Sequence, residues 1–322
     1  MSSLAVRTGL SLASPGGTRG RLTILIFHRV LSVKDELLPD LPDALEFERK
    51  MLWIRRWFNV LPLSTAVDRL FDGSIPRRSL SITFDDGYAD NEQIAAPLLH
   101  RLGLSATFFV STGFLNGSCM WNDRVIEAVR ATRSESIDLE GAGLPALPLH
   151  SLQARQEAIA RILTAIKHLD PIERDAAVTR IVECCAAPRI ADLMMREHQV
   201  RRLCELGMEV GAHTVSHPIL TRLAAGAAHA EIWSSKSHLE GIVGSPVRLF
   251  AYPNGVPQRD YAAAHVQMVR DCGFAAAVST AWGAASRRSD RFQLPRFTPW
   301  DATASRFGIR MTLNLMRRPQ SA

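Results

Sequence analysis

The sequence contains no apolar run long enough to cross a membrane. Nothing in its 322 residues approaches the ~18 consecutive apolar residues of a membrane-spanning helix. Residues 1–20 also lack the apolar stretch of a secretory signal peptide. The five cysteines are odd in number and include no C-x-x-C pair, which argues against a disulfide framework and against a thiolate zinc site. These absences predict a soluble protein of the reducing cytoplasm.

Dense Lys/Arg tracts with interleaved aromatic residues are also lacking, so nucleic acid is not the expected partner. The net charge is nevertheless +6 and the pI about 9.4. A basic protein of this kind favours an anionic neighbourhood, such as an anionic glycan or a membrane surface. Peripheral attachment to the inner face of a membrane therefore stays open, and the sequence leaves the oligomeric state undetermined.

The regular pattern that is present is an alternation of strands and helices. Residues 21–27 (RLTILIF) form a continuous apolar run, as in a strand buried on both faces. Residues 79–84 alternate polar and apolar, and residues 105–112 form a third strand after an intervening helix. A strand, a helix and a strand with short links form a βαβ unit. The sequence therefore predicts an α/β fold with a parallel sheet.

The pattern changes in the middle of the chain. Between about residues 116 and 196, two amphipathic helices follow one another without a convincing strand. We expect a flexible N-terminus over residues 1–20 and a single domain over residues 21–318. The segment 116–196 is then a helical insertion in that domain.

Candidate functional side chains stand where the strands end. Asp85 and Asp86 follow one strand, His213 and His217 share the loop after another, and His28 follows the first strand. An Asp-Gly pair is common in plain turns, and a single histidine is usually structural. In parallel α/β folds, however, active sites gather at the carboxyl ends of the strands. Two neutral histidines and one carboxylate form a divalent-metal site with open positions, which leaves the second aspartate free as a base.

Three motifs in order resemble a known family. They are TFDDG at 83–87, HTVSHP at 213–218 and FAYPNG at 250–255. They are similar to motifs of the polysaccharide deacetylases with a NodB-homology domain, carbohydrate esterase family 4. The resemblance extends over residues 21–297 outside the insertion. It implies a distorted (β/α) barrel of about seven parallel strands and a hydrolase that removes N-acetyl groups from N-acetylhexosamine units of a glycan.

The same resemblance implies roles for individual residues. Asp86, His213 and His217 would be the metal ligands, and Asp85 would be the general base. Zinc is the first candidate for the metal, and cobalt, nickel and iron are alternatives because this ligand set accepts several ions.

One departure from the family pattern concerns an arginine that orients the base. The third motif commonly carries this arginine, but the matching position here is Ala251. Arg248 lies nearby in sequence and is expected to be a surface residue. Arg296, after another expected strand, is the candidate replacement.

A second departure concerns the general acid. The family usually ends with a strand carrying Leu-x-His, and no such motif occurs near this C-terminus. The first strand instead ends with Leu25, Ile26, Phe27 and His28. A closed barrel brings its first and last strands together, so one strand can move from the end to the beginning. We therefore predict a circularly permuted chain that most resembles the deacetylases of exopolysaccharide synthesis, with His28 as the general acid.

Substrate contacts are expected from the third motif and from aromatic residues. Tyr252, Pro253 and Asn254 are candidates for substrate or oxyanion binding, with the oxyanion N–H assigned to Asn254 by the resemblance. Trp121 and Trp282 are candidates for stacking on a sugar ring, although tryptophan is also frequent in cores.

Rival functions remain at this point. One is an inactive glycan-binding relic of the same fold, and another is an amide hydrolase for a non-sugar substrate. Non-haem iron oxygenases also use two histidines and a carboxylate. In those enzymes one histidine is close in sequence to the carboxylate, and the scaffold is all-β.

Overall fold

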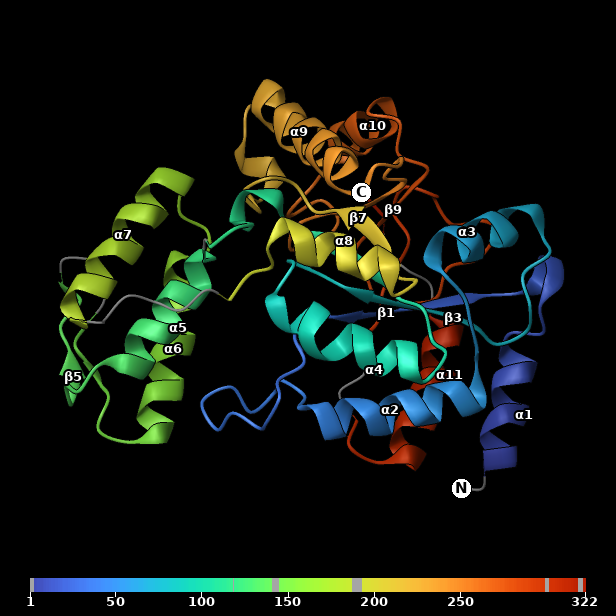
Figure 1. Cartoon of the computed structure of the whole chain (residues 1–322), viewed down its shortest axis with the longest axis horizontal. Helices are drawn as coiled ribbons and strands as arrows, with labels where there is room; N and C mark the ends of the chain where they lie inside the picture. Colours follow the sequence, from blue (N-terminus) through green and yellow to red (C-terminus); the bar gives the residue numbers. More distant parts are fainter. Residues whose placement is uncertain (1–2, 118, 141–144, 187–192, 299–300, 318–320) are drawn as a thin grey trace. The chain divides into compact units, whose positions relative to one another are not determined.

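The computed structural model contains the parallel sheet that the strand and helix alternation predicts (Figure 1). The structure describes residues 3–117, 119–140, 145–186, 193–298, 301–317 and 321–322, so residue 318, the expected end of the domain, lies outside the described residues. The strands of the main sheet are all parallel and run in the order β1-β3-β4-β7-β8-β9, with β2 also paired to β3. Their bounds are β1 Leu22–Phe27, β2 Asn59–Val60, β3 Ser79–Phe84, β4 Thr107–Val110, β7 Glu209–Ala212, β8 Leu249–Ala251 and β9 Ala276–Val278.

An extended segment, residues 294–297, joins the two edges of this sheet. Leu294 forms a parallel bridge with Val278 of β9, and Phe297 forms one with Leu25 of β1. Backbone hydrogen bonds of 2.8 to 3.1 Å run on both sides of the segment. The sheet therefore closes into a distorted (β/α) barrel of seven strands, which confirms the predicted fold class.

Side chains alternate between the inside and the outside of this barrel because neighbouring residues of a strand face opposite ways. The inner core includes Ile24, Phe109, Val278 and Leu294, and Leu70 of helix α3 packs against it. The outer core lies between the strands and the surrounding helices and includes the side chains of Leu25, Phe27, Ile82, Phe84 and Phe108. The helices of this unit are α1 Ser3–Ala13, α2 Ala44–Trp57, α3 Leu63–Asp72, α4 Ala96–Arg101, α8 Glu197–Glu205, α9 Ala225–Val243, α10 Ala263–Asp271 and α11 Ala304–Met316, with short turns η1 Gly17–Arg19, η2 Asn91–Ala95, η3 Thr112–Phe114 and η5 Leu220–Arg222.

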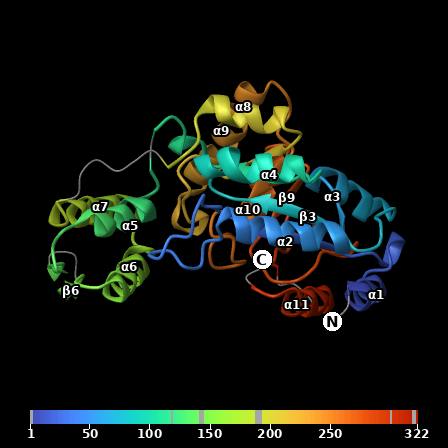
Figure 2. The same ribbon diagram turned by 60° about the horizontal axis from the view of Figure 1, so that its bottom comes forward.

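The N-terminal stretch, which was expected to be flexible, contains a helix. Residues 3–13 form helix α1, which packs beside α11 (Figure 2). Val6 and Leu10 lie one turn apart and are fully buried. These two residues form an apolar contact face although Ser, Thr and Gly surround them. The sequence did not predict this helix, and the flexibility of residues 1–20 stays a prediction.

The middle of the chain forms a second compact unit made of residues 33–41 and 117–194. Its helices are α5 Trp121–Ala131, α6 Leu152–Ile166 and α7 Pro171–Cys184, with a short hairpin of β5 Ser136–Ile137 and β6 Leu147–Pro148. Ser151 caps α6 and Asp170 caps α7 through their side-chain oxygens. Apolar residues of this unit, such as Val125, Ile162 and Ile181, form a core of their own. Nothing in the sequence indicated that residues 33–41 belong to this unit. The single-domain interpretation of residues 21–318 stays a prediction.

Gly211 of β7 allows the Phe109 ring to cross the barrel interior. A β-carbon at position 211 would collide with that ring. We predict that Gly211→Ala destabilises the protein by about 1–3 kcal/mol, as overpacking of a core does. The measurement is the urea midpoint of unfolding.

Gly241→Ala is the matched control, because a β-carbon there meets nothing within contact distance on exposed helix α9. Alanine should leave stability unchanged or raise it by up to about 1 kcal/mol, since it favours helix more than glycine does. Equal stability of the two variants would contradict the packing role of Gly211.

Candidate metal and catalytic centre

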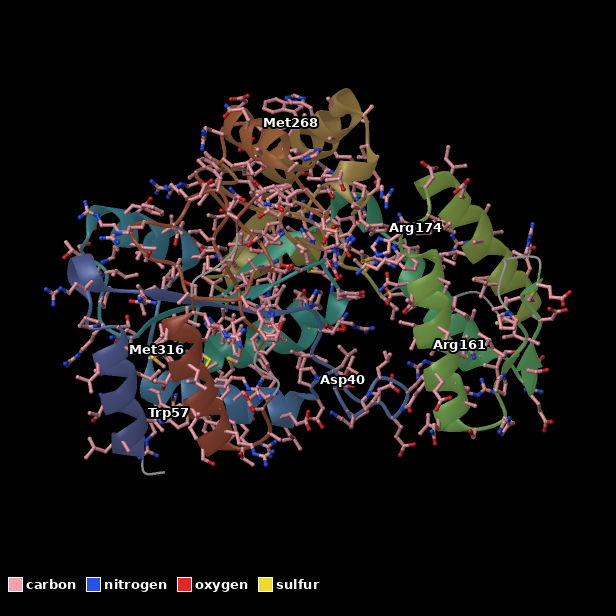
Figure 3. All side chains as sticks on the ribbon, turned by 180° about the vertical axis from the view of Figure 1, so that it is seen from behind. Asp40, Trp57, Arg161, Arg174, Met268 and Met316 are labelled. Carbon is pink, nitrogen blue, oxygen red and sulfur yellow. The ribbon has the colours of Figure 1, made fainter. Side chains whose placement is uncertain are left out.

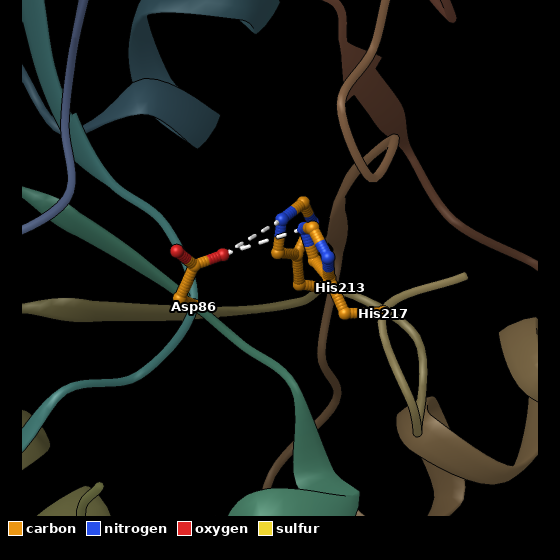
Figure 4. Close-up of side chains that lie close together, drawn as sticks. All are labelled: Asp86, His213 and His217. Atoms are coloured by element: carbon orange, nitrogen blue, oxygen red, sulfur yellow. Dashed lines mark ion pairs between the residues drawn. The ribbon is translucent and has the colours of Figure 1, made fainter. Parts of the chain in front are cut away.

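Three side chains from two strand ends converge at the carboxyl end of the barrel. Asp86 follows β3, and His213 and His217 belong to the loop after β7. Asp86 Oδ1 lies 3.5 Å from His213 Nε2 and 3.4 Å from His217 Nε2 (Figure 4). Ligand atoms of all three residues lie within 4.8 Å of one another. The arrangement brings together the three residues predicted as metal ligands.

The backbone of this site is held in unusual conformations. Asp86 (φ 78°), Thr214 (φ 64°), His217 (φ 53°) and Asn254 (φ 57°) all have positive φ values. Such values cost free energy for residues other than glycine, and they cluster at functional sites where the surrounding structure enforces them. Of these residues, Asp86 and His217 belong to the converging group.

The chemistry of this group fits a divalent cation. Asp86 Oδ1 is buried and accepts no hydrogen bond from the described residues, although a buried carboxylate oxygen normally has a partner. His213 Nδ1 donates to the Ala251 carbonyl oxygen at 2.7 Å, which leaves Nε2 with its lone pair. A backbone carbonyl that fixes the histidine tautomer in this way is typical of metal-ligating histidines. Two imidazoles and one carboxylate leave further coordination positions open.

The charge states of the three groups also follow from their burial and neighbours. Burial alone would raise the pKa of Asp86, but the His213 and His217 rings lower it below its usual range. Burial lowers the pKa of His217 to about 4, which keeps its imidazole neutral at neutral pH. Burial alone would also lower the pKa of His213, but the neighbouring Asp85 and Asp86 carboxylates outweigh it, so the pKa of His213 rises. A cation binds the neutral imidazole, so its binding would displace any proton that His213 holds.

The second aspartate, Asp85, is paired with Arg296 inside the barrel. Arg296 donates from Nη1 to Asp85 Oδ1 at 2.6 Å and from Nη2 to Oδ2 at 2.7 Å, and both residues are buried. Its Nε donates to the Ser279 carbonyl oxygen at 2.9 Å, and its guanidinium lies 5.7 Å above the centre of the Phe109 ring. Burial would raise the pKa of Asp85, but the Arg296 charge outweighs it and the pKa falls. Asp85 is thus held as an oriented carboxylate.

Arg248, the other arginine considered, lies elsewhere. It is exposed and pairs with Asp68 at 3.1 Å. The expectation that Arg248 is a surface residue is confirmed, and the bidentate contact to Asp85 comes from Arg296 alone among the described arginines.

His28 stands at the end of β1, with its side chain exposed. Its charge contributes to lowering the pKa values of both Asp85 and Asp86, so its ring lies within electrostatic range of the site. Asn91 Nδ2 donates to the His28 carbonyl oxygen at 2.8 Å. Asp90, which follows β3, accepts a hydrogen bond from Arg29 Nε at 2.7 Å, and Arg29 is the residue after His28.

Asp90 and Asn91 were not anticipated from the sequence. They anchor the loop that carries His28, and Asn91 begins the π-helical turn η2. A signal was present in the Asp-Asn pair that follows the TFDDG motif, but sequence alone did not connect that pair with the distant residue 28.

The third motif contributes less than expected through its tyrosine. The Tyr252 side chain is buried in the outer core, stacks on Tyr261 at 3.9 Å and donates its hydroxyl to the Phe292 carbonyl oxygen at 3.0 Å. Its backbone N–H donates to Val278 O at 3.2 Å. The Tyr252 side chain therefore points away from the barrel interior, because Ala251 faces inward and the next residue of the strand must face outward. A substrate-binding role of Tyr252 stays a prediction.

Pro253 is buried, and Asn254 is half-buried at the turn that follows β8. The Asn254 carbonyl oxygen accepts from Thr280 Oγ1 at 2.7 Å. The backbone N–H of Asn254 donates to no acceptor among the described residues. Asn254 thus keeps the donor that an oxyanion would need.

The two tryptophans considered for sugar stacking fall in different units. Trp121 begins α5 in the second unit, and the Arg174 guanidinium lies 5.1 Å from the centre of its ring. Trp282 is 43% exposed in the first unit and packs edge-on against Phe297. A role of either residue in sugar binding stays a prediction.

Comparisons with known proteins agree with this site and fold. The model of the polysaccharide deacetylase family matches residues 72–277. The curated protein YxkH of Bacillus subtilis (strain 168), named for the same family, is 33% identical over 92 residues, which are 28% of this chain and 32% of that protein. The match thus spans about a third of the length of this relative.

Two solved structures share the fold. The Streptococcus pyogenes deacetylase PplD in complex with acetate has a TM-score of 0.57 at 18% identity, and the match covers 86% of this chain and 92% of that one. IcaB from Ammonifex degensii also has a TM-score of 0.57, at 17% identity, over 89% and 97% of the two chains. At these identities the likeness concerns the fold alone. For IcaB it extends over nearly the whole of that chain.

We predict that the purified protein holds one divalent ion per chain. Asp86→Ala and His213→Ala should each abolish this binding, because a site with two remaining ligands holds a metal far more weakly. Elemental mass spectrometry after incubation with zinc measures the content. His198→Ala, on an exposed face of α8, is the control and should keep the metal. A wild-type protein without metal would contradict the site.

We also predict that Arg296→Met destabilises the protein by about 3–5 kcal/mol, because it leaves the buried Asp85 carboxylate without its counter-charge. The double variant Arg296→Met/Asp85→Asn should recover part of this loss. Urea unfolding of the four proteins of this double-mutant cycle gives the coupling energy. Additive losses would show that the pair contributes no interaction of its own.

Proposed function

The chain belongs to the polysaccharide deacetylase family, and we propose that it hydrolyses the N-acetyl groups of N-acetylhexosamine units in a polysaccharide or glycan precursor. The observation that carries this proposal is the pairing of two neighbouring carboxylates with different partners. Asp86 lies beside two imidazoles, whereas Asp85 is held by a guanidinium. Metal-assisted amide hydrolysis uses such a division, with one group to hold the Lewis acid and one to accept a proton.

Asp86, His213 and His217 would hold the cation. When bound there, a divalent ion, with zinc first and cobalt, nickel or iron as alternatives, supplies Lewis-acid polarisation of the acetyl carbonyl and lowers the pKa of a water molecule.

Asp85 would act as the general base. Both of its oxygens accept hydrogen bonds from Arg296, which fixes the plane of the carboxylate and keeps it ionised. An oriented and ionised carboxylate can accept the proton of an attacking water through a remaining lone pair. Arg296 therefore acts on the reaction through Asp85, as the arginine of the third motif would.

Asn254 and His28 would complete the reaction. The unused N–H of Asn254 can donate to the oxygen that becomes negatively charged when water adds to the carbonyl. His28, when protonated, can give its proton to the amine nitrogen, which would otherwise leave as an unstable anion. β1, which carries His28, pairs with β3 on one side and with the closing segment on the other. This position of the first strand supports a permuted arrangement.

The relic hypothesis drew its support from the missing arginine of the third motif. The bidentate contact of Arg296 removes that support. A non-sugar amide substrate remains the second candidate, and the comparison of acetate release from an N-acetylhexosamine oligomer and from an acetylated peptide separates the two. The cytoplasmic location stays a prediction. No helix in the described part of the chain has the length and apolar character needed to cross a bilayer.

We predict that His28→Ala lowers the rate of acetate release from an N-acetylglucosamine oligomer by about 10²–10⁴-fold, the usual contribution of a positioned acid or base. Metal content should stay at the wild-type level, because His28 is not among the three ligands.

His198→Ala again serves as the control, with wild-type rate and metal content. A fully active His28→Ala protein would refute the role of His28 and the permutation argument, whereas loss of the metal in this variant would make His28 a ligand.

A further inference from the structure

A pocket of about 450 Å³ lies on the outside of the barrel wall, between α11 and the loop that carries Trp282. We call it the α11 pocket, and the side chains that matter for its chemistry are Trp282, Arg306, Arg310, Leu313, Asn314 and Arg317. Phe297, which bridges β1, also lines it. The pocket thus shares the closing segment with Arg296, but its lining residues include none of the proposed metal ligands, nor Asp85 or His28.

Large apolar side chains of α11 stand in solvent beside the pocket. Ile309 is 47% exposed, Leu313 is 53% exposed and Met316 is 60% exposed. They lie four and three residues apart, which places them in one stripe along the helix. Figure 3 shows Met316 on α11, next to α1. A stripe of this kind is typical of helices that lie in the interface of a bilayer.

Positive charge surrounds the same surface. Arg306 pairs with no carboxylate among the described residues, and the guanidinium of Arg317 lies over the Trp282 ring at 5.3 Å. Arg310 pairs with the buried Asp301 at 2.7 Å, which is the carboxylate within the pocket. Three arginines against one carboxylate leave the pocket cationic. Cationic side chains flanking exposed apolar ones complement anionic headgroups above acyl chains.

Asn314 adds a polar group to the floor of the pocket. The side chain is 2% exposed, and its Nδ2 donates to the Gly283 carbonyl oxygen at 3.1 Å. Its Oδ1 is buried and accepts no hydrogen bond from the described residues. A buried acceptor without a partner is costly, and a hydroxyl group of a ligand would satisfy it.

We propose that the α11 face docks on an anionic membrane surface and takes up one phospholipid headgroup in the α11 pocket. The headgroup phosphate meets Arg306 and Arg317, a headgroup hydroxyl donates to Asn314 Oδ1, and Ile309, Leu313 and Met316 enter the boundary of the acyl chains. A membrane fits better than a free phosphate ion, because a free ion would leave the apolar stripe in water. The occupant is thus a phospholipid with a hydroxylated, anionic headgroup.

The test is co-sedimentation of the full chain with vesicles made of equal parts of phosphatidylglycerol and phosphatidylcholine, compared with vesicles of phosphatidylcholine alone. The wild-type protein should bind the first kind and not the second. Each arginine near an anionic surface contributes about fivefold in affinity. Arg306→Gln/Arg317→Gln should therefore bind about 25-fold more weakly, and Ile309→Ser/Leu313→Ser should also lose most of the binding.

The matched control is Arg201→Gln/Arg202→Gln on exposed α8, which removes the same net charge from a helix on the other side of the sheet from α11 in Figure 2. It should keep wild-type binding. If the two double arginine variants lost vesicle binding equally, docking through the α11 face would be refuted. Displacement by inorganic phosphate, with no effect of the serine variants, would mean a site for a free anion and would overturn membrane docking.

Asn314→Leu tests the pocket itself. It removes the buried acceptor and should weaken binding to phosphatidylglycerol vesicles more than binding to phosphatidic acid vesicles, which lack the headgroup hydroxyls. Equal weakening on both would refute the role of Asn314. Acetate release from a soluble oligomer, measured on the same arginine and serine variants, should match wild type, so failure of docking and failure of the proposed reaction are separable.

Discussion

The bidentate ion pair between Asp85 and Arg296 is the interaction on which the site depends. Two adjacent carboxylates at the end of β3 repel each other and are buried, so each needs its own compensation. Arg296 reaches Asp85 only because residues 294–297 bridge β9 and β1. The segment that closes the barrel therefore also fixes the orientation of the Asp85 carboxylate. The same pair requires Phe109 beneath the guanidinium, and Phe109 in turn requires glycine at position 211.

With Asp85 compensated by Arg296, Asp86 is the carboxylate left facing the histidines. Its Oδ1 has no hydrogen bond from the described residues, and its backbone is held at positive φ. The unpaired oxygen and the positive φ both cost free energy in the folded state. The two imidazoles lie 3.4 and 3.5 Å from this oxygen without a hydrogen bond to it, so the fold maintains a buried, charged cluster that a bound cation would stabilise. Local instability that persists inside a well-packed barrel is typical of a functional site.

Strand periodicity and strand ends allowed the parallel sheet and the convergence of Asp86, His213 and His217 to be predicted from the sequence, whereas the resemblance implied which aspartate would be the base. Those features depend on local pattern and on one general rule of parallel sheets. The features that the sequence did not predict depend on partners distant in sequence. Helix α1 packs on α11 and α2, both distant in sequence, and residues 33–41 join a unit whose other residues lie more than 75 positions away. Tyr252 was assigned to the site from the third motif, although the inward direction of position 251 implies that the Tyr252 side chain faces outward.

The position of the arginine explains why Ala251 is small. Residue 251 and residue 296 both face the barrel interior, and only one guanidinium can occupy both oxygens of Asp85 in a bidentate contact. A second arginine at position 251 would add a buried charge without a counter-charge, at a cost of several kcal/mol. Ala251 avoids this conflict and contributes instead through its carbonyl, which accepts from His213 Nδ1. The backbone of β8 thus orients His213, while the closing segment between β9 and β1 supplies the charge that compensates Asp85.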